Sequence, residues 1–142
     1  MMNRKEDKFW KAKAYLYRIR EAERRVELLE RRMDMREDAG LNTDELRREL
    51  ALAEQDAKNV AVEVTDVISR LADVNQQMVM TKRYVDNLSW ERIAFDMNMP
   101  VRAVQKLHGR ALPLLQGMVE EDASIRSMLP WSGLGDETAE AD

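Results

Sequence analysis

The chain has 142 residues, of which 44% are hydrophobic and 35% charged, with no cysteine and a net charge of −4. This length suits one domain with an appendage, and this composition is typical of a helical globular protein. The absence of cysteine excludes a disulfide framework and a thiolate metal site, and no apolar run is long enough to span a membrane. The opening residues, MMNRKEDKFWK, lack the apolar core of a signal peptide. We therefore expect a cytoplasmic protein.

The charge is distributed unevenly along the chain. Residues 81–117 carry six basic and three acidic side chains, a net charge of +3, whereas residues 118–142 carry one basic and seven acidic side chains, a net charge of −6. A basic segment inside an acidic chain argues against broad affinity for nucleic acid, but it allows one local face that contacts DNA.

Two long helices are predicted on either side of Gly40. Before it, apolar or small residues recur at alternating steps of three and four, the spacing of a coiled coil: Ala12, Tyr15, Ile19, Ala22, Val26, Leu29 and Met33. The same spacing returns in the second helix at Leu46, Leu50, Ala53, Ala57, Val60, Val64, Val67 and Leu71. Asn42 and Glu45 have the spacing of a capping box at the start of this second helix.

The two apolar stripes fit each other if the chain folds back at Gly40. Met33 then lies opposite Leu46, and every pair further out has numbers that sum to 79, as far as Ala12 and Val67. This register places the a positions of one helix against the d positions of the other, as an antiparallel coiled coil requires. Because two helices alone bury little apolar surface, either the C-terminal part covers a second face of this hairpin or two hairpins pair as a homodimer.

The segment LSWERIAFDMNMPVRAVQKLHGRAL, residues 88–112, is predicted to form two helices joined by a tight turn, after a helix over about residues 76–86. Ser89 is a suitable N-cap for the first of the two helices. Asn98 suits a left-handed turn residue, and Pro100 forces the residue before it out of helical geometry.

The second of these helices, over about residues 100–112, has two different faces. Its apolar face holds Val104, Leu107 and Ala111, and residues 100–112 contain no acidic side chain. Its polar face consists of Arg102, Gln105, Lys106 and Arg110. Such a helix suits the major groove, where cationic and amide side chains contact phosphates and base edges. A face that only contacts solvent is the alternative. We expect Pro113 to stop or kink the helix.

The segment KRYVDNLSWERIAFDMNMPVRAVQKLHGRALPLL resembles the helix-turn-helix of region four in sigma-70 family factors, through R-Y, L-S-W-x-x-I-A and V-x-x-x-x-x-R-A-L. With the preceding hairpin, it is similar to small phage and prophage regulators of late transcription. The resemblance implies that Arg102, Gln105 and Lys106 face the bases and that Arg110 contacts a phosphate. It also implies an apolar framework of Trp90, Ile93, Ala94, Val104, Leu107 and Ala111. The chain departs from the family at Pro100, where a Ser cap is usual.

Signals for other classes of function are weak. The only histidine, His108, has no nucleophile or orienting carboxylate beside it in a recognisable pattern, so we expect a helix-surface residue near the DNA face and no enzyme. The acidic residues have no metal-ligand spacing, and there is no glycine-rich phosphate loop. We therefore expect no cofactor and no metal.

Together these patterns predict an all-α fold. A long antiparallel coiled-coil hairpin (residues 1–74) would precede a small sigma region-four-like helix-turn-helix domain (75–117) and an acidic, partly disordered tail (118–142). The predicted function is a DNA-binding transcriptional regulator of phage or prophage type in a bacterial host cell. Its partners would be double-stranded DNA, RNA polymerase and a second copy of the hairpin, with no membrane. The alternative is a coiled-coil protein-interaction module or a phage DNA-packaging or assembly factor.

Overall fold

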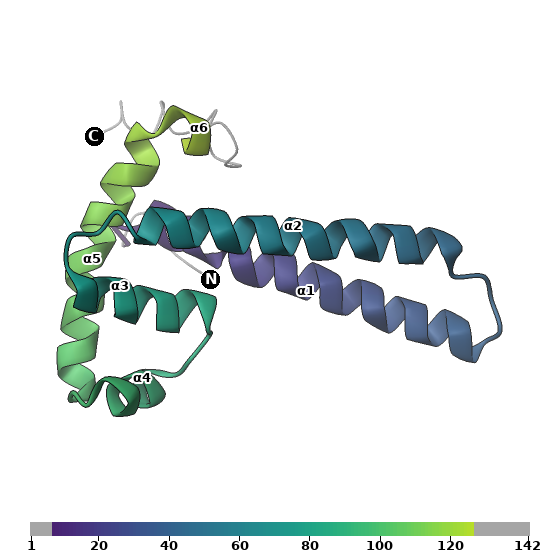
Figure 1. Cartoon of the computed structure of the whole chain (residues 1–142), viewed down its shortest axis with the longest axis horizontal. Coiled ribbons are helices and arrows are strands. Elements are labelled where there is room, and N and C mark those ends of the chain that lie inside the picture. Colours follow the sequence, from purple (N-terminus) through teal and green to yellow (C-terminus); the bar gives the residue numbers. More distant parts are fainter. Residues whose placement is uncertain (1–6, 127–142) are drawn as a thin grey trace.

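The computed structural model describes residues 7–126 of the chain (Figure 1). Within this range every regular element is helical, and none is a strand: α1 (Trp10–Asp38), α2 (Asp44–Ile68), α3 (Val74–Met80), the π-helical turn η1 (Thr81–Val85), α4 (Trp90–Met97), α5 (Val101–Glu121) and α6 (Ala123–Arg126). The all-α fold that the sequence predicts is confirmed.

The two longest helices, α1 and α2, lie side by side and run in opposite directions (Figure 1). Every residue of the two predicted apolar stripes is buried or half-buried. Two ion pairs join the helices along one side, Arg18 with Glu63 and, at 4.0 Å, Arg32 with Glu49. In both pairs the residue numbers sum to 81, so one constant register holds between the two contacts.

The start of α2 differs from the sequence prediction. The helix begins at Asp44, so Thr43 is the N-cap and the expected capping box of Asn42 and Glu45 is wrong. The Asn42 side-chain oxygen instead accepts a hydrogen bond from the Asp44 N–H at 2.7 Å, which satisfies one of the free donors at the helix start. Gly40 has a φ of 71°, the left-handed conformation that glycine adopts without steric cost.

Helix α5 is longer than the sequence predicts. It continues through Pro113, which we expected to stop or kink it, and ends at Glu121. Pro113 itself is exposed, while Leu112 and Leu115 beside it are buried in a core shared with α1 and α2. This apolar packing outweighs the backbone hydrogen bond that a proline cannot make. Consequently α5 crosses the predicted boundary at residue 117 and links the α1/α2 pair to α3 and α4 (Figure 1).

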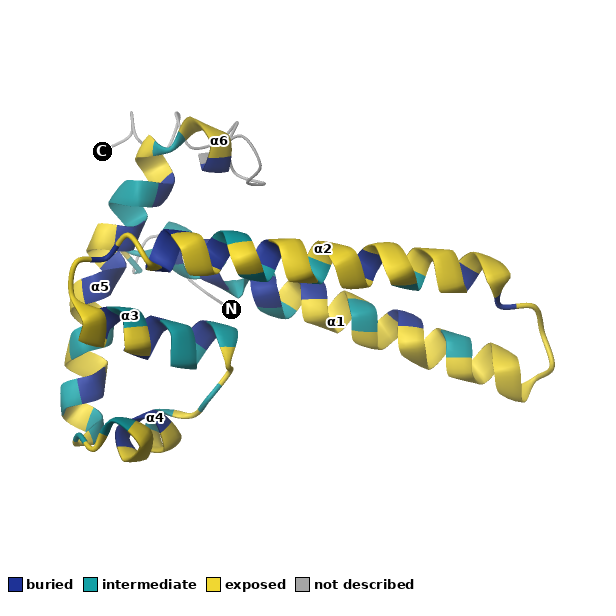
Figure 2. Ribbon diagram, in the orientation of Figure 1, coloured by how far each residue is buried: buried dark blue, intermediate teal, exposed yellow. Residues whose placement is uncertain are grey.

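Most of the hydrophobic core lies where α5 and η1 meet one end of the α1/α2 pair. The largest side chains there have less than 2% of their surface exposed: Tyr15, Leu16, Ile68, Met80 and Leu115. We call residues 21–38 and 44–59, at the other end of the pair, the distal half. It has only four buried residues, in a single layer between the two helices: Ala22, Leu29, Leu46 and Ala53 (Figure 2).

The first residues of the predicted acidic tail are helical, because they form the end of α5 and α6, where Val119 and Ile125 are buried. The rest of that predicted tail, residues 127–142, lies outside the described residues. Across residues 7–126, no helix combines the length and the apolar character needed to cross a lipid bilayer.

Candidate nucleic-acid interface

The start of α4 is fixed by a side-chain cap. The Ser89 hydroxyl oxygen accepts a hydrogen bond from the Arg92 N–H at 3.1 Å, so the predicted N-cap is confirmed. Glu91 lies in the first turn, where a carboxylate is favourable beside the free N–H groups of the helix. Local interactions of Ser89 and Glu91 therefore determine where this helix begins.

The turn between α4 and α5 has the predicted geometry. Asn98 adopts the left-handed conformation, with φ 53° and ψ 48°. The Met99 N–H donates to the Ala94 carbonyl at 3.0 Å, which closes the C-terminus of α4. Pro100, with φ −65°, precedes α5 and provides no side-chain cap. Only three residues thus separate the two helices.

A small second core holds α3, α4 and α5 together. Its buried members are Val79, Ile93, Ala94 and Val104. Of the apolar framework that the family resemblance implies, Trp90 and Leu107 also pack against this core, half-buried. Ala111, by contrast, is fully buried in the larger core that α5 shares with α1 and α2. The orientation of α5 is therefore set by two cores, one on each half of the helix.

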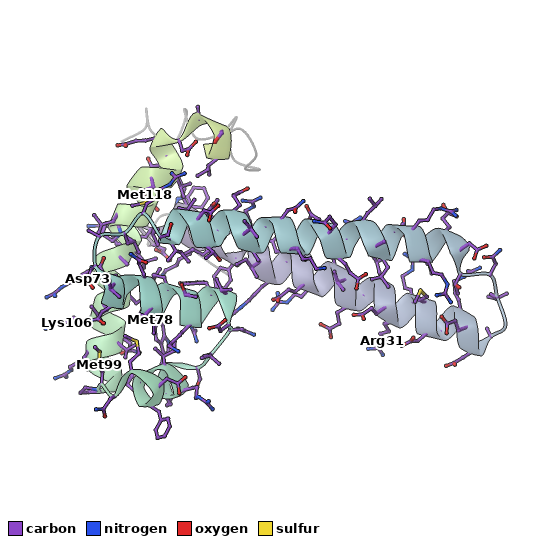
Figure 3. The ribbon with its side chains drawn as sticks, in the orientation of Figure 1. Arg31, Asp73, Met78, Met99, Lys106 and Met118 are labelled. Carbon is purple, nitrogen blue, oxygen red and sulfur yellow. The ribbon has the colours of Figure 1, made fainter. Side chains whose placement is uncertain are left out.

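The four predicted DNA contacts lie together on the open side of α5. Arg102, Gln105, Lys106 and Arg110 are all exposed, as is Gly109 between them. At 100° per residue these positions form one stripe, opposite the buried Val104 and Ala111. Figure 3 shows Lys106 on α5, at the end of the molecule away from Arg31 in the distal half.

Among residues 7–126, these four side chains have no partner, unlike the cations of η1 and α4. Lys82 and Arg92 both pair with Asp96, at 3.8 and 3.0 Å, and the Arg83 guanidinium lies over the Trp90 ring at 4.4 Å. Within residues 7–126, no hydrogen bond or ion pair engages Arg102, Gln105, Lys106 or Arg110. Within residues 7–126, these charges on α5 are therefore not neutralised by a partner, and the first turn of α5 contains no acid that would oppose an anion.

The structure corrects the prediction for His108, which is not a surface residue. Its ring is half-buried and stacks on Tyr84, with centroids 5.7 Å apart, and meets the edge of Trp90 at 4.9 Å. The Tyr84 hydroxyl lies 2.7 Å from His108 Nε2. Burial, with smaller contributions from Lys13 and Arg83, lowers the pKa of His108 to about 4, so the ring is neutral at pH 7. The ring thus lies where α5 packs against η1 and the start of α4.

One exposed apolar residue on α4 was missed. Phe95 on α4 is 82% exposed, although large apolar side chains are usually buried. The signal was present in the sequence, because Ile93, Ala94 and Met97 define the buried face of α4 and Phe95 falls outside it.

In the part of the chain that the structure describes, no group of three His, Cys, Asp or Glu side chains is placed to hold a metal ion. No protein-family model, curated protein or solved structure matches the chain. The similarity to sigma region four thus rests on the residues of this chain alone.

Proposed function

We propose that the protein is a DNA-binding transcriptional regulator, in which α4 and α5 form a helix-turn-helix carried by the antiparallel coiled-coil hairpin of α1 and α2. The observation that carries the proposal is the stripe of Arg102, Gln105, Lys106 and Arg110, which is exposed and has no partner among residues 7–126, on a helix that follows a tight turn. The N-terminal half of α5 would dock in the major groove of double-stranded DNA.

The chemistry of the stripe fits this role. Arginine and lysine side chains on one helix face neutralise phosphates, and this term supplies most of the affinity of many DNA-binding proteins. Arg102 and Gln105 are able to make paired hydrogen bonds to guanine and adenine edges, respectively. Arg110, one turn after Lys106 on α5, would contact a phosphate. Val101 and Ala103 leave few further polar groups in the first turn, so we expect direct base contacts to be few.

The test is the binding of the full chain to duplex DNA, measured by fluorescence anisotropy over a range of salt concentrations. We expect Arg102→Ala/Lys106→Ala to weaken binding. If both cations contact phosphates, it should also reduce the slope of log K against log salt by up to about 2, since each phosphate contact contributes about 0.9.

The matched control is Arg31→Ala/Lys58→Ala, which removes two exposed cations from α1 and α2 and changes the net charge equally. This variant should bind as the unmodified protein does. If the two double variants lose the same affinity, binding depends on total charge and not on α5. If Arg102→Ala/Lys106→Ala changes neither affinity nor slope, the groove assignment is wrong.

A contact with RNA polymerase, which the family resemblance implies, is a further part of the proposal. Phe95 is the candidate residue for this contact, because an exposed aromatic side chain on α4, the helix before α5, suits a protein contact.

The alternative function is a protein-interaction module or a DNA-packaging or assembly factor. It is favoured by the apolar side chains exposed on α1 and α2. Sequencing of genomic fragments retained by the protein separates these roles, since a regulator should enrich promoter segments.

A further inference from the structure

Two leucines are exposed on the distal half of the α1/α2 pair. Leu28 on α1 is 62% exposed and Leu52 on α2 is 73% exposed. The distal half is also thin, with one buried layer between two helices and nothing in residues 7–126 packed on its sides (Figure 2). Helix pairs of this kind gain most of their stability when a further apolar face is covered.

The exposed leucines lie on the flank of the pair that α5 leaves open. On α1, Leu16 follows the stripe residue Tyr15 and is buried in the core shared with α5, whereas Leu28 precedes the stripe residue Leu29. Since successive residues turn by 100°, Leu16 and Leu28 lie on opposite sides of the stripe. We call the side with Leu28 the open flank.

Leu52 lies on the same open flank. It is three residues after Glu49 and four before Asp56, which places the three side chains on one side of α2. Glu49 pairs with Arg32 across the helices, and Asp56 lines a shallow groove together with Leu28. The two leucines therefore face the same direction.

The open flank has opposite charges on its two helices. On α1, Leu28 lies between Arg25 and Arg32. On α2, Leu52 lies between Glu49 and Asp56. A surface with a basic half and an acidic half, each around a leucine, is complementary to a copy of itself turned by half a turn.

We propose that the open flank binds a second copy of this chain, and that the two distal halves form a four-helix bundle. The two-fold axis would run parallel to the helices, which places α1 of one copy on α2 of the other and Leu28 against the partner's Leu52. Each arginine row then faces an acidic row. A two-fold axis across the helices would instead place arginines on arginines, so the charge pattern selects the first arrangement.

This arrangement has a consequence for the rest of the molecule. Because the axis runs along the helices, both copies point the same way and the two α5 helices lie at one end of the bundle. A dimer of this form would present two stripes of Arg102, Gln105, Lys106 and Arg110 to one ligand. The pairing itself uses none of these residues and does not depend on DNA binding.

The first test is sedimentation of the full chain without DNA, over a range of concentrations. We expect a dimer for the unmodified protein, and for Leu52→Lys a dissociation constant raised by about 100-fold or more, because the new cation would lie against arginines of the partner. The control is Ala51→Lys, which adds the same charge at the neighbouring exposed position, outside the open flank. Circular dichroism should show the same helix content for all three proteins.

The second test uses the absence of cysteine from the chain. Full-length Leu28→Cys and Leu52→Cys proteins are mixed and oxidised, and we expect the 28–52 cross-linked heterodimer to form in excess over both homodimers. A monomer at all concentrations would overturn the proposal. A dimer that Leu52→Lys leaves intact, or one that cross-links mainly through 28–28, would also overturn it.

Discussion

Acidification should destabilise the fold through His108. In the folded chain burial lowers the pKa of this ring to about 4, against 6.5 for an ordinary histidine. Between these values the unfolded chain binds a proton that the folded chain excludes, so stability is full above pH 6.5 and falls as the pH drops towards 4. From pH 7 to pH 5 the free energy of unfolding would fall by about 2 kcal/mol through this ring alone. Because the ring keeps some solvent contact, we expect a loss of about 1–2 kcal/mol.

The measurement is urea unfolding followed by circular dichroism at pH 7 and pH 5. The matched variant is His108→Phe, which keeps a ring between Tyr84 and Trp90 but cannot titrate, so its free energy of unfolding should lose less over the same interval. The fold lowers the pKa of Asp7 through a hydrogen bond from Lys13, and that of Asp122 through hydrogen bonds from Ser124 and Arg70. The stability that these two carboxylates contribute is lost only below about pH 3.8. They therefore do not interfere.

A direct measurement can refute this reasoning. His108 is the only histidine, so one set of imidazole signals in an NMR titration reports its pKa without assignment. A value near 6.5 would mean that the ring is solvated and does not pack against Tyr84. An equal loss of stability in His108→Phe would assign the pH dependence to other groups.

Two further predictions concern the α4–α5 unit. Gly109→Ala should raise the free energy of unfolding by about 0.5–1 kcal/mol, because the position is helical and a Cβ there meets no atom within 4 Å; thermal unfolding measures this, and destabilisation would indicate a close neighbour. Ser89→Ala should cost about 1 kcal/mol by removing the cap on Arg92 N–H, whereas Ser89→Asp should restore it; equal stability of all three proteins would show that water replaces the cap.

Local sequence signals predicted much of this structure. The three-four spacing of apolar residues marked both long helices, because the period of a buried stripe is a property of the helix itself. Ser89 and Asn98 marked the start and end of α4, because a cap and a left-handed turn depend on one or two neighbouring residues. The exposed stripe on α5 was predicted in full, since its residues face away from the apolar side of their own helix.

Contacts between distant segments decided what the sequence left open. A proline usually stops a helix, and only the packing of Leu112 and Leu115 against α1 and α2 carries α5 past Pro113. His108 looks like a surface residue on its own helix, and it is half-buried because Tyr84 and Trp90 of other elements pack against it. Leu28 and Leu52 were recognisable as lying off the stripes, but the open flank is defined by where α5 packs. Periods and caps act over a few residues, whereas burial depends on which segments meet, and that is fixed only when the whole chain has folded.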